Sequence, residues 1–203
     1  MIERLKDMKL RILFATLTIA ALSGCVPTYM LVKAGPTPVA SNAFRVQPTG
    51  PWNQVPANLS QTKYEEVWTR NGPLLETVAF IGALPEGQAV IVQGKKEEKR
   101  VPLFRADMSP QDLASMVEAS YRVRGVTVFN TESVDPVDFL GGKGLQVRFN
   151  YAPDNGISKK GSAVLRVIDK KLYVMKLEGV SSLYYDAAVP EFDLLVATAA
   201  LPN

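Results

Sequence analysis

The sequence predicts an α+β domain, in which an antiparallel β-sheet of about six strands is packed by two main helices. Apolar and polar residues alternate strictly over 145–151, which is typical of a half-buried antiparallel strand. Two other stretches, after Ser109 and around Phe192, repeat their apolar residues at helical spacing. Several strands with one helix midway and one at the end of the chain favour a sheet with helices packed on it.

Residues 1–24 predict a lipoprotein signal peptide. The basic residues Lys6, Lys9 and Arg11 precede the apolar stretch 12–21, and Leu22-Ser23-Gly24-Cys25 then ends on the only cysteine of the chain. A charged start, an apolar run and small residues before a cleavage site are the parts of an export signal, in that order. A membrane anchor that is never cut is disfavoured, because a bilayer-spanning helix needs about 20 apolar residues.

This N-terminal pattern resembles the lipobox of bacterial lipoproteins. The resemblance implies that the Cys25 thiol takes a diacylglyceryl group, that cleavage follows, and that the freed amine is commonly acylated too. Two or more acyl chains anchor a protein stably to a membrane, where one chain is marginal. Val26 stands where aspartate tends to retain such proteins in the inner membrane, so the resemblance implies the periplasmic face of the outer membrane.

The composition excludes several classes of function. Removal of residues 1–24 takes away four of the 23 basic and two of the 20 acidic residues, which leaves 19 bases against 18 acids. This balance gives no electrostatic support for binding nucleic acid. The chain has no histidine, which excludes catalytic triads. With Cys25 acylated, disulfides and thiolate chemistry are excluded as well, and we expect no cofactor and no metal.

Residues 25–61 are expected to form a lipidated N-terminus and a tether, because six prolines disfavour long regular elements: Pro27, Pro36, Pro38, Pro48, Pro51 and Pro56. The apolar residues of 29–32, together with Phe44 and Trp52, leave open that this segment packs as edge strands or against the body. Regular apolar patterning begins near Tyr64, which predicts a single folded domain over 62–203.

The elements of this domain follow in order. Residues 64–69 and 74–82 predict a hairpin around Asn71-Gly72, and two further short strands are expected at 88–92 and 101–105. Ser109-Pro110-Gln111-Asp112 predicts the start of a helix that ends at Gly125. Strands at 126–134 and 145–151 precede a second hairpin, and a final helix starts near Pro190. The second hairpin is expected at 162–168 and 172–178.

This order of elements resembles the PsbP/Mog-like fold over roughly 64–201. The parts that carry the resemblance are the Val67-Trp68-Thr69 and Asn71-Gly72 hairpin, the Ser-Pro-capped helix that leads into a long strand, and the closing helix over 192–201. The resemblance implies a compact, non-catalytic domain used for docking. It transfers no functional residue to this chain.

Four groups of residues are candidates for catalysis, phosphate binding or calcium binding. Glu132, Asp135 and Asp138 form a carboxylate cluster that a turn-rich strand end explains better than an acid/base pair. Ser158-Lys159-Lys160 and Ser181-Ser182 could supply a serine with a lysine base, but the Ser-x-x-Lys spacing is absent. The run 141–144 lacks the spacer of a phosphate loop, and 154–156 lacks the acids of a calcium loop.

Tyr184 and Tyr185 are candidate interface anchors, because aromatic rings with a polar end suit half-buried contacts. The sequence therefore predicts a membrane-anchored periplasmic module that binds or scaffolds an envelope protein. The alternative is a periplasmic hydrolase that uses carboxylates or a Ser-Lys pair. A pocket with two convergent carboxylates, or a serine that touches a lysine amine, would favour the enzyme. A flat apolar patch would favour docking.

Overall fold

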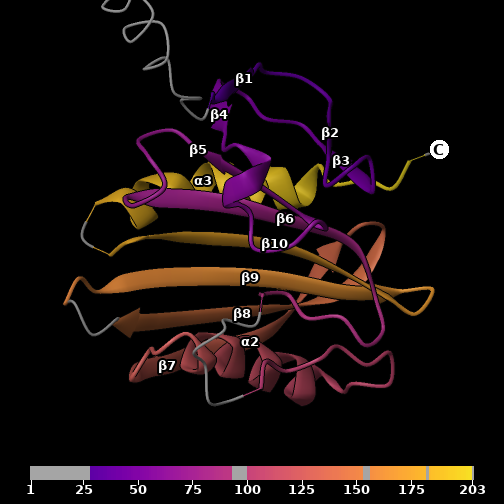
Figure 1. Cartoon of the computed structure of the whole chain (residues 1–203). Helices are drawn as coiled ribbons and strands as arrows, with labels where there is room; N and C mark the ends of the chain where they lie inside the picture. The colour runs from indigo at the N-terminus through magenta and orange to yellow at the C-terminus, as the bar shows by residue number, and fades with distance from the viewer. Residues whose placement is uncertain (1–27, 93–99, 153–155, 182, 203) are drawn as a thin grey trace, which may run out of the picture.

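A computed structural model describes residues 28–92, 100–152, 156–181 and 183–202. Its main sheet has eight antiparallel strands in the order β1-β4-β5-β6-β10-β9-β8-β7, and a small second sheet holds β2 and β3 (Figure 1). This confirms the predicted α+β class, with eight strands in the main sheet instead of about six. The strands are β1 Met30–Val32, β2 Thr37–Val39, β3 Phe44–Val46, β4 Trp52–Gln54, β5 Glu65–Thr69, β6 Glu76–Pro85, β7 Val128–Phe139, β8 Gly142–Ala152, β9 Lys159–Ile168 and β10 Lys171–Val180.

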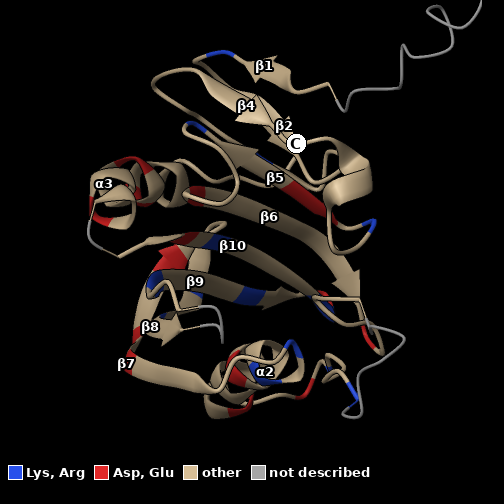
Figure 2. Cartoon of the chain, turned by 60° about the vertical axis from the view of Figure 1, so that its left-hand side comes forward, with Lys and Arg blue, Asp and Glu red and all other residues tan. Residues whose placement is uncertain are grey.

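The two long helices, α2 (Pro110–Val123) and α3 (Tyr184–Ala197), pack on opposite faces of the sheet (Figures 1 and 2). Successive strand residues point to opposite faces, so each face builds its own apolar core. Met175 of β10 packs with α3, whereas its neighbour Val174 packs with α2. Among the described residues, no helix combines the length and the apolar character that crossing a bilayer requires.

The described part of the expected tether, residues 28–61, is part of the folded domain. β1 pairs with β4, and β4 pairs with β5, so these two short strands extend the sheet at the edge where a hairpin alone was expected. Phe44 and Trp52 are at most 1% exposed. The boundary at residue 62 therefore does not separate a tether from a core, and β1 and β4 are the edge strands that the sequence left open.

Burial of aromatic rings explains why this segment folds back. The Phe44 ring lies 6.1 to 6.2 Å from the rings of Phe80, Phe139 and Tyr173, which come from three different strands of the main sheet. Burial of apolar area contributes about 25 cal/mol per Å². The prolines are compatible with it because the strands that they flank, and β2, which contains Pro38, have only three residues each. The segment thus covers the α3 face of the sheet beside the helix.

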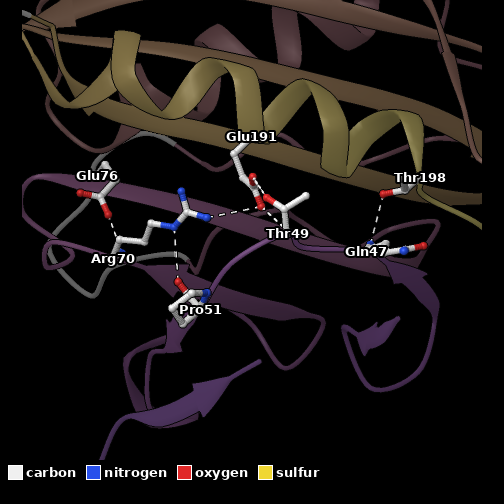
Figure 3. A network of polar contacts seen from close by, with 7 residues as sticks. All are labelled: Gln47, Thr49, Pro51, Arg70, Glu76, Glu191 and Thr198. Atoms are coloured by element: carbon white, nitrogen blue, oxygen red, sulfur yellow. Dashed lines mark hydrogen bonds and ion pairs between the residues drawn. The ribbon is translucent and has the colours of Figure 1, made fainter. Parts of the chain in front are cut away.

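A polar network fixes the same segment to α3 (Figure 3). Glu191 of α3 accepts hydrogen bonds from the Thr49 backbone N–H at 2.9 Å and from its hydroxyl at 2.5 Å. It also forms an ion pair with the Arg70 guanidinium at 3.4 Å. The Gln47 N–H donates to the Thr198 hydroxyl at 3.1 Å. Because the partners come from three separate stretches of chain, the network holds the N-terminal segment in one position.

Gly82 on β6 shows how closely the N-terminal segment approaches the sheet. A Cβ atom at this position would lie 2.2 Å from the Cβ of Ala43 and 2.9 Å from that of Ala40. We therefore expect Gly82→Ala to lower the free energy of unfolding by about 1–3 kcal/mol through overpacking. Urea denaturation followed by tryptophan fluorescence would measure the change. Gly50→Ala is the control, because the nearest atom there is 3.5 Å away; equal stability of both variants would contradict the close approach.

The predicted strands at 88–92 and 101–105 are wrong, because the described residues of these stretches form no strand. They are joined by one pair of backbone hydrogen bonds, from Gly87 N–H to the Phe104 carbonyl at 2.9 Å and from Phe104 N–H to the Gln88 carbonyl at 2.8 Å. The Phe104 side chain is completely buried. One buried ring therefore anchors a loop where the apolar pattern suggested two strands.

The first helix is confirmed in detail, and the second begins earlier than expected. Ser109 and Asp112 form a reciprocal capping box at the start of α2, and Gly125 with φ +84° ends it. α3 begins at Tyr184 and contains Pro190 inside its span, whereas the sequence placed Pro190 near the start. Tyr185 and Ala188 are buried ahead of the proline, so core packing extends the helix toward its N-terminus.

The expected turn-rich end of the strand over 126–134 is instead a continuous strand. β7 runs to Phe139 through Pro136, and its pairing with β8 shifts register between Thr131 and Ser133. β7 lies at the edge of the sheet, where a proline removes no ladder hydrogen bond that a neighbour needs. The carboxylates that the sequence placed in a turn therefore lie along an edge strand.

Candidate functional site

A cavity of about 370 Å³ opens on the α2 face of the sheet, beside the part of that face which α2 covers. Its floor consists of residues from β5, β6 and β10. Its walls come from the segment 55–61, the end of β8, the start of β9, and the end of α2 with the residues that follow it. Among the lining side chains are Leu59, Glu65, Tyr121, Tyr151, Lys176 and Glu178.

A buried ion pair lies on the floor of this cavity. The Lys176 ammonium lies 2.7 Å from Glu178 Oε2, and the two side chains are 15% and 13% exposed. The Tyr151 hydroxyl donates to Glu178 Oε1 at 2.6 Å. Burial alone would raise the pKa of Glu178, but the Lys176 charge and the hydrogen bonds from Lys176 and Tyr151 outweigh it and lower the pKa to about 2. Glu178 is therefore firmly ionised.

The pKa of Glu65, in the same cavity, is shifted in the opposite direction to that of Glu178. Burial raises its pKa above the usual value, and the Lys176 charge and a hydrogen bond from the Gln61 backbone N–H, at 2.5 Å, only partly offset this. Glu65 lies on β5 and Lys176 on β10, the two strands that flank β6. The site thus holds one carboxylate whose pKa is lowered and another whose pKa is raised.

The Tyr121 side chain packs against the same charged pair. Tyr121 is 5% exposed, and its hydroxyl lies close enough to the Glu178 carboxylate to help lower the pKa of that group. The Lys176 ammonium lies over its ring, 5.4 Å from the centroid. Tyr121 therefore belongs to the polar lining of the cavity, together with Lys176 and Glu178.

The carboxylates predicted from the sequence do not form a pair. Glu132 accepts from the Asn150 amide at 2.9 Å, Asp135 pairs with Arg148 at 3.2 Å, and Asp138 pairs with Lys143 at 2.8 Å. Each has a different partner on β8; Glu132 and Asp138 are exposed, and Asp135 is half-buried. They line the outer strand of the sheet and not the cavity.

The proposed serine–lysine arrangements are not brought together either. Among the described residues, no hydrogen bond joins a serine hydroxyl to a lysine amine, and the Ser181 N–H instead donates to the Ser158 carbonyl at 3.2 Å. Lys160 pairs with Asp186 at 3.3 Å. Cys25, Ser182 and the possible calcium turn at 154–155 lie outside the described residues. Within the described ranges, no three His, Cys, Asp or Glu side chains converge as a metal site would require.

The two candidate interface tyrosines differ in position. Tyr185 is 8% exposed and belongs to the core under α3, so it is not available as an interface anchor. Tyr184 is half-buried at the first residue of the helix. The basic and acidic residues of the described chain are mixed over the elements and do not gather by sign (Figure 2).

Of the charged residues that line the cavity, only Lys159 was a candidate from the sequence, as a possible lysine base, and Lys176 and Glu178 were not predicted as site residues. Lys176 and Glu178 share one face of β10, and an i, i+2 pair of charges is usually a sign of a solvated face. The one available signal is that the flanking residues Met175 and Leu177 are apolar, as is Val174 on the charged face. Charges that interrupt a strand with two apolar faces indicate a buried polar site.

Comparison with known proteins shows the fold. Family models and curated proteins give no match to the chain. The solution structure of cyanobacterial PsbP (CyanoP) from Synechocystis sp. PCC 6803 matches with a TM-score of 0.54 and 10% identity, over 90% of this chain and 99% of its own. The crystal structure of the Saccharomyces cerevisiae Ran-binding protein Mog1p matches with a TM-score of 0.50 and 10% identity, over 87% of this chain and 96% of its own. At this identity the likeness concerns the fold alone, and it confirms the predicted PsbP/Mog-like architecture.

Proposed function

We propose that this PsbP/Mog-like domain is a non-catalytic binding module of a bacterial envelope lipoprotein, and that it takes a polar group of a protein partner into the cavity beside α2. The observation that carries the proposal is the cavity itself, in which the largely buried Glu65, among the described residues, accepts a hydrogen bond on Oε2 alone. Polar groups in such cavities fix the orientation of a ligand, and the apolar walls bury it.

The state of Glu178 supports a binding role over catalysis. Both of its carboxylate oxygens are engaged, one by Lys176 and the other by Tyr151. A nucleophile or general base needs an oxygen that can reach the substrate. Mog1p, which shares the fold, is a Ran-binding protein, which fits a domain that acts by binding.

One observation favours a carboxylate hydrolase as a second candidate. The pKa values of Glu65 and Glu178 are shifted in opposite directions within one cavity, which is a feature of acid/base pairs in enzymes. A captured partner that is recovered cleaved, and cleaved only when Glu65 is intact, would favour the hydrolase. A partner recovered whole when Glu65 is intact supports the binding module.

Photo-crosslinking tests the binding site. A photoreactive amino acid at Leu59, which lines the cavity and is 50% exposed, should capture the partner in intact cells. The control position is Leu103, which is also 50% exposed but does not line the cavity. We expect capture at position 59 only, and its loss in the Glu65→Gln background when the thermal melt shows that the protein is folded. Equal capture from both positions, or capture at position 59 that is unchanged in the Glu65→Gln variant, would count against the cavity as the binding site.

The lipid anchor is a further part of the proposal, supported by the order of charge, apolar run, small residues and cysteine in residues 1–25. Cys25→Ala should leave an uncleaved precursor and abolish incorporation of labelled palmitate. Val26→Asp should move the protein from the outer-membrane to the inner-membrane fraction on a sucrose gradient. Palmitate labelling that survives Cys25→Ala would refute the anchor, and an unchanged gradient profile would refute the sorting.

A further inference from the structure

Three consecutive large apolar side chains are exposed at the N-terminal edge of the sheet. Tyr29, Met30 and Leu31 are 41%, 57% and 63% exposed. Every other strongly exposed large apolar side chain of the described residues is isolated from the next along the chain. Single exposed apolar residues are ordinary on protein surfaces, whereas a contiguous group marks a contact surface.

The position of this group restricts what can cover it. β1 is the outermost strand at one edge of the sheet and lies at the extremity of the molecule (Figure 1). Met30 and Leu31 are neighbours in a strand, so their side chains point to opposite faces. Both are exposed. The edge is therefore apolar on both of its sides, and a flat partner surface could cover only one of them.

The distance to Cys25 points to the occupant. Tyr29 is the fourth residue after Cys25 along the chain, and four residue steps span at most about 14 Å. We propose that Tyr29, Met30 and Leu31 form a membrane-contact edge that inserts into the phospholipid leaflet holding the acylated Cys25. The inference rests on the proposed lipid anchor, and it adds an orientation of the domain, with β1 toward the bilayer.

The chemistry of the group fits a lipid interface. Tyrosine has an apolar ring and a polar hydroxyl, which suits the headgroup level, and Met and Leu suit the acyl boundary just below it. Lys33, exposed just after β1, adds a positive charge next to the edge. Basic residues near a bilayer surface are attracted by anionic lipids.

Site-specific fluorescence tests the orientation. The full-length lipidated protein is purified from membranes and reconstituted into vesicles of phosphatidylethanolamine and phosphatidylglycerol, with or without brominated acyl chains. Acylation occupies the only native thiol, so Leu31→Cys offers a single site for the dye NBD. Leu183→Cys is the matched control, because both leucines are 63% exposed and four strand spacings separate β1 from β10, the strand preceding Leu183.

We expect blue-shifted NBD emission and several-fold stronger quenching by brominated lipid at position 31 than at position 183, with Met30→Cys behaving like Leu31→Cys. Equal emission and equal quenching at both positions, in protein that still floats with the vesicles, would overturn the contact edge and leave the anchor intact. A blue shift at position 31 without lipid quenching, rising with protein density, would indicate pairing of two copies and would also overturn it. Protein without acyl mass that fails to float would refute the anchor, and the inference with it.

Discussion

A chain that begins at Lys63 is expected to lose the cooperative thermal unfolding that a chain beginning at Thr28 retains. Residues 28–61 supply β1 and β4 of the main sheet, and Phe44 and Trp52 of the core under α3. Their removal would expose the strand edge of β5 and the buried ring of Trp68. Circular dichroism during heating of the two lipid-free proteins would measure the difference.

Phe44→Ala tests the same packing with one residue. The side chain is 1% exposed and contacts three aromatic rings, so its loss should lower the free energy of unfolding by about 3–5 kcal/mol. Leu31→Ala, at an exposed position of the same segment, should change it by about 0.5 kcal/mol or less. If the chain from Lys63 unfolds cooperatively with the same midpoint as the longer chain, the N-terminal segment is dispensable and its packing contributes little.

Lys176→Met should be the most destabilising single change in the cavity. It leaves the Glu178 carboxylate buried without its partner, and breaking a buried ion pair in this way costs about 3–5 kcal/mol. Lys143→Met is the matched control, because the Lys143–Asp138 pair is as short, at 2.8 Å, but its side chains are 78% and 79% exposed. Exposed pairs contribute about 0–1 kcal/mol. Similar losses in the two variants would show that the cavity pair is not desolvated.

The pH dependence of stability should separate the two cavity carboxylates. Glu178 has a pKa of about 2 in the folded state against an ordinary 4.5, so its contribution is present above pH 4.5 and is lost as the pH falls toward 2. At about 1.36 kcal/mol per pKa unit, this contribution is about 3 kcal/mol. Glu178→Gln should remove this loss of stability at acid pH in a urea titration.

Glu65 should change the pH dependence of stability in the opposite direction to Glu178. Because its pKa is raised on folding, the stability that it contributes is present below the ordinary pKa of 4.5 and is lost as the pH rises through the higher folded-state value. Glu65→Gln should remove that loss. If both variants keep the pH profile of the unmodified protein, the two carboxylates do not titrate as the cavity requires.

Local signals predicted the parts of the fold that are made of neighbouring residues. The capping box at Ser109 and the apolar spacing of α2 needed no distant partner, and the hairpins joined strands adjacent in sequence. The strands β1 and β4 were left open by the sequence and not predicted, because three residues carry too little periodicity. The start of α3 was misplaced because proline is common at the first position of a helix, whereas buried Tyr185 extends this helix one turn and more before Pro190.

The cavity could not be predicted from the sequence for a topological reason. Glu65 and Lys176 lie far apart in the chain, and they share a cavity only because β10 pairs with β6 on the side opposite β5. No local pattern specifies that pairing. The sequence instead drew attention to Glu132, Asp135 and Asp138, which are close together in the chain. In the structure they are spread along β7, and each contacts a different residue of β8.

The construction of β7 has a consequence for the behaviour of the protein in a crowded compartment. A twelve-residue strand at the border of a sheet is a template on which another chain could add itself by main-chain pairing. Pro136 has no N–H to donate to an added strand. The register shift between Thr131 and Ser133 also bends β7, which disfavours regular pairing along its free edge. An added strand from another chain would also have to remove water from the charged side chains of Asp135 and Asp138. These features oppose the addition of strands from other chains at β7, so we expect edge-to-edge aggregation through this strand to be unfavourable.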